Sequence, residues 1–134
     1  MSDANVEVVR RGYEALGRFE VEPFLPDCDP ELEFVSLVGQ VEGGSYRGHE
    51  GMRKFVSDLA EAWDLWEPVP EHLEGAGDNV IATGRTRLRG KGSGVVIDFE
   101  WGQVFRFRNG KLLWTRIYSD PAEARREYEV LTAG

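Results

Sequence analysis

The sequence contains a single cysteine, Cys28, and two histidines, His49 and His72, which lie in separate segments. One cysteine excludes an internal disulfide and any metal site built from several cysteines. Two separated histidines do not supply the clustered ligands of a zinc site. We therefore expect neither a bound metal nor a cofactor.

Long apolar runs are also missing from the sequence. No segment approaches the roughly 20 apolar residues that a helix needs to cross a bilayer. The N-terminal segment lacks the basic and apolar regions of a secretory signal peptide. We expect no membrane association and a cytoplasmic location.

Basic side chains are the minority, with 16 Lys and Arg against 24 Asp and Glu and a net charge of −8. The one local row of cations is Arg85, Arg87, Arg89 and Lys91. The acidic balance argues against a nucleic-acid partner. The hydrophobic fraction of 41% and the charged fraction of 30% are typical of a globular chain. We expect a single domain over residues 1–134.

Three predicted strands follow one another between residues 78 and 119, and the rest of the chain is interpreted around them. They span residues 79–89, 95–108 and 111–119. Gly90 to Gly94, with three glycines in five residues, is a turn between the first two strands. Asn109-Gly110 separates the second and third, and it is a strong hairpin signal because both residues tolerate positive φ.

The predicted strand at 95–108 has two different faces, because side chains alternate along a strand. Its odd positions are Val95, Ile97, Phe99, Trp101, Gln103, Phe105 and Phe107. Its even positions are mostly charged, so the odd face must meet a core or line a pocket. Gln103 is the only polar residue of that face, and a buried amide needs hydrogen-bond partners. A neighbouring backbone or a ligand could supply them.

Two amphipathic helices are predicted from apolar side chains at helical spacing. The first covers residues 3–17 and carries Tyr13 on its apolar stripe. The second begins at Gly48-His49, and its stripe continues as far as Trp63. Prolines 68 and 70 are expected to end this second helix.

Shorter elements complete the chain. We expect a helical turn at 23–25, a strand at 32–38, a glycine-bearing loop at 41–48 and a strand at 69–74. A C-terminal helix should begin after Asp120, which is a suitable N-cap residue. This order of elements predicts an α+β domain, with helices packed on one face of a curved, mostly antiparallel sheet.

Five short segments occur in an order and spacing that resemble a known family. They are Val9–Leu16, Tyr46–Gly51, Gly77–Val80, Phe107–Lys111 and Tyr118–Asp120. Together they resemble the SnoaL-like branch of the nuclear transport factor 2-like superfamily, over essentially the whole chain. The resemblance implies a cone-shaped fold, in which a strongly bent sheet wraps around three main helices and leaves a pocket at its open end. It also implies a homodimer, since the outer sheet face often pairs in this superfamily.

The superfamily includes polyketide cyclases, ketosteroid isomerase, limonene epoxide hydrolase, scytalone dehydratase and non-enzymatic binding domains, so the fold does not fix the function. In the epoxide hydrolase pattern, an Arg-x-Asp pair and a later Asp would fall at Arg85, Arg87 and Ile117, so the arginine is kept and both carboxylates are missing. Ketosteroid isomerase needs a carboxylate base on an early strand, where this sequence offers only Glu33. Many SnoaL-like sequences carry a histidine where Gln103 stands, and glutamine cannot shuttle a proton at neutral pH.

Strand alternation and the resemblance together predict one apolar, aromatic-lined cavity. The residues expected around it are Tyr13, Phe34, Trp63, Arg85, Trp101, Gln103, Thr115 and Ile117. An arginine that faces a cavity must be paired. Arg85 is therefore expected to meet Glu14, Asp58 or an anionic ligand group. With the opposite facing of its strand, Arg85 would instead join Arg87 and Arg89 on a solvated face.

Trp114, Arg116 and Tyr118 would share the outer sheet face with Arg106. Exposed aromatic side chains on a sheet face are uncommon in monomers, so we expect a homodimer through this face. Coverage by the C-terminal helix is the alternative.

Three functions fit the sequence. We favour a protein that binds a small hydrophobic molecule in the aromatic pocket. The alternative is an isomerase, cyclase or dehydratase acting on a small hydrophobic carbonyl compound. In that enzyme Arg85 would stabilise an enolate while Tyr13 and Gln103 position the oxygen, although no general base is evident. The third is a structural dimer whose own side chains fill the cavity. A titratable group in the cavity, with a path to solvent, would discriminate among them.

Overall fold

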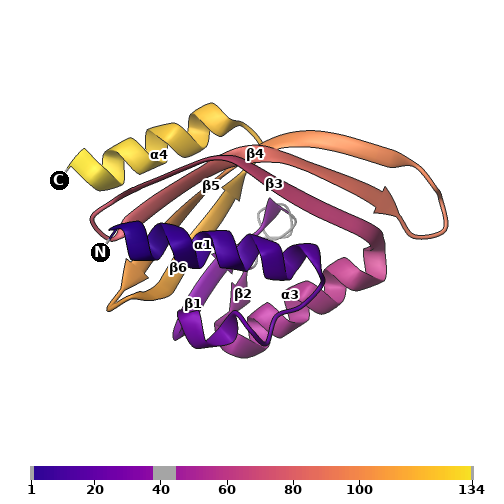
Figure 1. Cartoon of the computed structure of the whole chain (residues 1–134), viewed down its shortest axis with the longest axis horizontal. Coiled ribbons are helices and arrows are strands. Elements are labelled where there is room, and N and C mark those ends of the chain that lie inside the picture. The colour runs from indigo at the N-terminus through magenta and orange to yellow at the C-terminus, as the bar shows by residue number, and fades with distance from the viewer. Residues whose placement is uncertain (1, 38–44, 134) are drawn as a thin grey trace.

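Six strands form one strongly bent sheet that packs against three helices in the computed structural model (Figure 1). The structure describes residues 2–37 and 45–133. The helices are α1 (Ser2–Gly17), α3 (Gly48–Ala62) and α4 (Pro121–Ala133), with a short 3-10 helix, η1 (Leu25–Asp27). The strands are β1 (Cys28–Val35), β2 (Tyr46–Arg47), β3 (Trp63–Ala76), β4 (Asn79–Gly90), β5 (Val96–Arg108) and β6 (Lys111–Tyr118).

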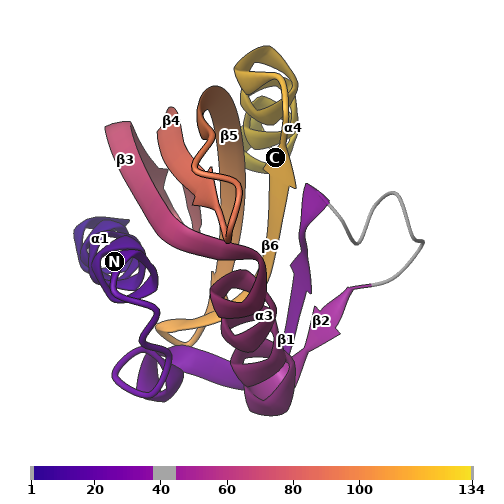
Figure 2. The ribbon, with the colours of Figure 1, turned by 90° about the vertical axis from the view of Figure 1, so that its right-hand side faces the viewer.

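The strand order is β2-β1-β6-β5-β4-β3, and each neighbouring pair is antiparallel except β1 and β6, which are parallel. Figure 2 shows the bend of the sheet, with α1 and α3 on its inner face. The prediction of an α+β fold with a curved, mostly antiparallel sheet and three main helices is confirmed.

The three strands predicted at residues 79–89, 95–108 and 111–119 are present with nearly these bounds, as β4, β5 and β6. The turn between β5 and β6 has positive φ at both residues, 53° at Asn109 and 77° at Gly110, as the sequence pattern required. Trp101, Gln103 and Phe105 of β5 are all buried on the inner face. The predicted inner face is therefore correct for the second half of the strand, whereas Val95 and Ile97 before it are 57% and 46% exposed and do not reach the core.

The second helix is shorter than predicted. It ends at Ala62, and Trp63 already belongs to β3, which runs through Pro68 and Pro70. These prolines do not break the strand because β3 is at the edge of the sheet, where a missing N–H on the open side costs no ladder hydrogen bond. The loop predicted at 41–48 and the end of the strand predicted at 32–38 fall partly outside the described residues.

The C-terminal helix packs on the outer face of the sheet, so the expectation that all helices share one face is wrong for α4 (Figure 1). A second core cluster lies beneath it, made of Ile81, Val104, Tyr118, Ala124 and Tyr128. The predicted cap is present, since the Ala122 N–H donates to Asp120 Oδ1 at 2.9 Å.

A glycine in β5 lets α4 approach this closely. A Cβ atom built at Gly102 would lie 2.5 Å from the Cβ of Ala124 and 3.1 Å from the Cα of Pro121. The helix also covers Tyr118, which is only 8% exposed. One of the two aromatic residues that suggested a dimer is therefore buried within the chain.

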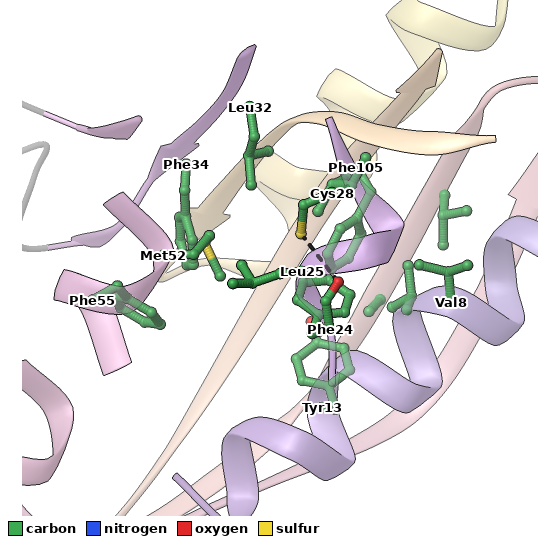
Figure 3. Close-up of a cluster of buried hydrophobic side chains, with 14 of the residues drawn as sticks. Val8, Tyr13, Phe24, Leu25, Cys28, Leu32, Phe34, Met52, Phe55 and Phe105 are labelled. Atoms are coloured by element: carbon green, nitrogen blue, oxygen red, sulfur yellow. Dashed lines mark hydrogen bonds between the residues drawn. The ribbon is translucent and has the colours of Figure 1, made fainter. Parts of the chain in front are cut away.

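The main core lies on the inner face, between α1, η1, α3 and the sheet (Figure 3). Figure 3 shows side chains from these elements, such as Leu25 and Met52, pointing into one cluster. Cys28 belongs to this cluster, and its thiol donates to the Phe24 carbonyl at 3.5 Å. Burial raises the pKa of the Cys28 thiol to about 12, so it is an inert core side chain. In the part of the chain described, no helix has the length and apolar character needed to cross a membrane.

Replacing Gly102 with alanine should loosen the contact between α4 and β5. The added methyl group has no room against Pro121 and Ala124, and overpacking of this kind costs about 1–3 kcal/mol of unfolding free energy. The measurement is the urea midpoint of the variant against the wild type.

Gly17→Ala is the matched control. A Cβ at Gly17 meets its nearest neighbours at 3.7 and 4.0 Å, which is ordinary contact, so its midpoint should not fall. Equal midpoints for wild type and Gly102→Ala would contradict the packing of α4 described above.

Candidate functional site

A cavity of about 510 Å³ lies between α1, α3 and the inner face of the sheet. Eight of its described lining residues are aromatic: Tyr13, Phe34, Tyr46, Phe55, Trp63, Trp66, Phe99 and Trp101. Its volume falls within the roughly 300–1,000 Å³ of small-molecule sites, which are typically apolar with a few polar groups.

Helical spacing along α3 and strand alternation along β5 determine which side chains line the cavity. Phe55, Leu59 and Ala62 lie on one face of α3, because residues three to four apart share a helix face. Along β5, the alternate residues Phe99, Trp101 and Gln103 all point into the cavity. The bend of the sheet brings these two walls together.

Most residues predicted for the site are at the cavity. Six of them line it: Tyr13, Phe34, Trp63, Trp101, Gln103 and Ile117. Thr115 lies beside an adjoining narrow recess that it shares with Tyr13 and Gln103. That these residues bind a ligand remains a prediction.

Arg85 is not at the cavity, and its predicted placement is wrong. In the register of β4 and β5 it lies opposite Glu100, while its neighbours Gly84 and Thr86 lie opposite Trp101 and Phe99. Thr86 and Leu88 line the cavity, whereas the Arg85 side chain is 46% exposed.

The partner of Arg85 is Glu100, with Nη1 and Oε1 3.1 Å apart, and not Glu14 or Asp58. Arg87 and Arg89 pair on the same face, with Asp98 at 3.4 Å and Asp64 at 2.7 Å. The three arginines thus occupy the solvated outer face, which is the alternative that strand alternation left open.

A chain of hydrogen bonds crosses the inner wall of the cavity. The Tyr13 hydroxyl donates to Gln103 Oε1 at 2.6 Å, and Gln103 Nε2 donates to Thr115 Oγ1 at 2.8 Å. Thr115 Oγ1 in turn donates to the Val104 carbonyl at 2.9 Å. Burial raises the pKa of Tyr13 well above its usual value, so the hydroxyl stays protonated and acts as a donor. The Gln103 amide is therefore bonded by side chains of α1 and β6.

Asp58 is a lining residue that the sequence argument considered only as a partner of Arg85. The Tyr46 hydroxyl donates to Asp58 Oδ2 at 2.8 Å, and Lys54 Nζ lies 3.2 Å from the same oxygen. These bonds, that of Tyr46 foremost, lower the pKa of Asp58, so the carboxylate is ionised at neutral pH. Its position three residues after Phe55 and four before Ala62 on the α3 stripe was the available signal.

Trp101 carries a further polar group of the cavity wall. Its indole N–H is buried and has no hydrogen-bond partner among residues 2–37 and 45–133. Its ring packs against Tyr13, with the ring centroids 5.2 Å apart. The two rings form a continuous aromatic surface beside Gln103.

Solved structures with the same architecture span nearly the whole chain. An NTF2-like protein from Burkholderia pseudomallei is 24% identical, with a TM-score of 0.78 over 96% of this chain and 98% of its own. TerC, co-crystallised with polyporic acid, is 21% identical, with a TM-score of 0.77 over 93% of this chain and 97% of its own. A SnoaL-like protein from a Jannaschia species is 20% identical, with a TM-score of 0.76 over 96% of this chain and 93% of its own. At these identities the likeness shows the fold alone.

No curated protein sequence matches this chain. The family model of the SnoaL-like domain matches residues 9–115, which include the second half of α1, all of α3, the strands from β1 to β5 and most of β6. The bent sheet, the inner helices and this match agree, and the chain belongs to the SnoaL-like domain family.

Proposed function

We propose that this protein binds a small, mostly apolar molecule in the aromatic cavity. The observation that carries the proposal is the cavity itself, about 510 Å³ in volume, with eight aromatic side chains around a hydrogen-bonded Gln103. A domain with a purely structural role would gain stability by filling such a space, because an apolar cavity forfeits packing energy. The open volume therefore supports a binding role over a structural one.

The polar groups at Gln103 define one end of the ligand. An amide nitrogen has two N–H groups, and the bond to Thr115 uses one of them. The Tyr13 oxygen donates its proton to Gln103 and can still accept a hydrogen bond. A hydroxyl or carbonyl oxygen on a flat apolar skeleton suits this pair.

An isomerase, cyclase or dehydratase activity is less well supported. Arg85, the residue expected to stabilise an enolate, lies outside the cavity. Tyr13 and Gln103 remain as partners for an oxygen, but the described lining contains one carboxylate, Asp58. Its lowered pKa makes it a weak base. Binding without catalysis is therefore the function we favour, in a cytoplasmic protein.

A homodimer through the outer sheet face is part of this proposal. Val69 and Val96 are exposed there, opposite Arg85 and Arg89 in the strand registers, and Trp114 is only partly covered by α4. Apolar side chains beside paired charges suit a self-complementary interface.

Light scattering at micromolar concentration should give twice the chain mass, and Val96→Lys should shift the protein toward monomer by placing a charge in the interface. A wild-type protein that is monomeric throughout this range would contradict the dimer.

Gln103→Leu should weaken binding of a neutral aromatic alcohol such as 2-naphthalenemethanol by roughly fivefold, because a neutral hydrogen bond contributes about 1 kcal/mol. Binding can be followed by quenching of tryptophan fluorescence, since Trp63, Trp66 and Trp101 line the cavity. Arg85→Met is the control and should bind like the wild type. Equal losses in the two variants, or no binding by the wild type at millimolar concentration, would contradict the proposal.

The same two variants should differ in stability. Gln103→Leu removes the acceptor of the buried Tyr13 hydroxyl, which costs about 1–3 kcal/mol of unfolding free energy. Arg85→Met breaks an exposed ion pair, which contributes about 0–1 kcal/mol. Urea unfolding measures both. A loss of about 3–5 kcal/mol in Arg85→Met, as expected for a buried pair, would show that Arg85 lies inside the fold.

A further inference from the structure

We propose that the cavity selects its ligand by charge: it accepts an aromatic molecule bearing a protonated amine and rejects the corresponding carboxylate. Asp58 and the rings of Phe34, Tyr46 and Phe55 form the selecting end. The inference rests on the proposed function of the same cavity and adds the chemical class of the ligand.

The charges around the cavity favour a cation. Among its described lining residues, Asp58 is the single charged side chain. Arg85, Arg87 and Arg89 are bonded to carboxylates on the outer face. An anionic ligand would therefore lose its hydration without gaining a cationic partner in the lining, which is costly in an apolar site.

Lys54 is the cation closest to this carboxylate. It lies one turn before Asp58 on α3, its side chain is 69% exposed, and it is not among the lining residues. The Asp58 side chain is itself 38% exposed. Lys54 Nζ lies 3.3 Å from Oδ1 and 3.2 Å from Oδ2 of Asp58, and Oδ2 also accepts from Tyr46. Oδ1 therefore keeps a lone pair for a ligand ammonium group, because each carboxylate oxygen can accept two hydrogen bonds.

Three aromatic rings of the cavity lining form one cluster, and one of them contacts Asp58. The Phe34 and Phe55 centroids are 4.4 Å apart, and the Phe55 and Tyr46 centroids are 5.3 Å apart at an interplanar angle of 66°. Tyr46 joins this group to the carboxylate through its hydroxyl. The faces of such rings attract a cation within about 6 Å of the centroid, so the rings and the carboxylate favour the same charge.

The two polar positions of the cavity come from different walls, Asp58 from α3 and Gln103 from β5. A ligand that uses both has a flat apolar skeleton with an oxygen at one end and an amine at the other. Neither position offers a carboxylate ligand a cationic partner.

Three probes with one skeleton test this inference at pH 7: 2-naphthylmethylamine, 2-naphthalenemethanol and 2-naphthoic acid, each titrated against the whole chain. The amine should bind most tightly, the alcohol next and the acid least, with the amine favoured over the acid by about tenfold or more. An acid that binds as tightly as the amine would overturn the inference.

Asp58→Asn should reduce the preference for the amine over the acid to about twofold, because the amide keeps an acceptor for Tyr46 but loses the charge. Glu61→Gln is the matched control, since it removes a carboxylate from an exposed position of α3 outside the described lining, and it should keep the wild-type order. An Asp58→Asn variant that keeps the full preference for the amine would also overturn the inference.

The neutral alcohol separates the two levels of the proposal. If it binds and the charged probes fail to follow the expected order, the charge selection is wrong and the binding function stands. If none of the three probes binds, the binding function fails and the charge selection fails with it.

Discussion

The need to satisfy one buried amide organises the inner side of this molecule. Gln103 lies on a strand face that is otherwise aromatic. An amide without hydrogen-bond partners there would cost more free energy than its packing contributes. Its bonds to Tyr13 and Thr115 join α1, β5 and β6 at one point. Because Tyr13 must reach the amide from α1, the helix is held against the sheet and the cavity keeps a polar anchor within an aromatic wall.

The cavity also depends on how the sheet is covered on its two sides. The central strands carry apolar residues on both faces, Trp101 and Phe105 inside and Ile81 and Val104 outside. A helix on the outer face is needed to bury the second set, and Gly102 gives α4 the room to do so. Because α4 covers the outer face, only α1 and α3 cover the inner face. The space between these two helices and the sheet remains open as the cavity.

Sequence reasoning predicted the elements that strong local patterns specify. The Asn109-Gly110 turn and the alternation along β5 fixed the hairpin and the facing of Gln103, since both depend only on neighbouring residues. The facing of Arg85 was predicted wrongly, because alternation alone leaves either face of its strand open and the resemblance implied the inner one. The start of β3 at Trp63 and the outer position of α4 depend on strand order and helix packing, which no local pattern contains.

The central claim is that Gln103 and the surrounding rings form a site for a ligand and not merely a gap in the core. A crystal structure of the protein grown with an aromatic alcohol tests this most directly. We expect density for the ring system between Tyr13, Trp63 and Trp101, with its oxygen within hydrogen-bond distance of Gln103. A cavity closed by inward movement of its own side chains, or a ligand bound only on the outer face, would contradict it.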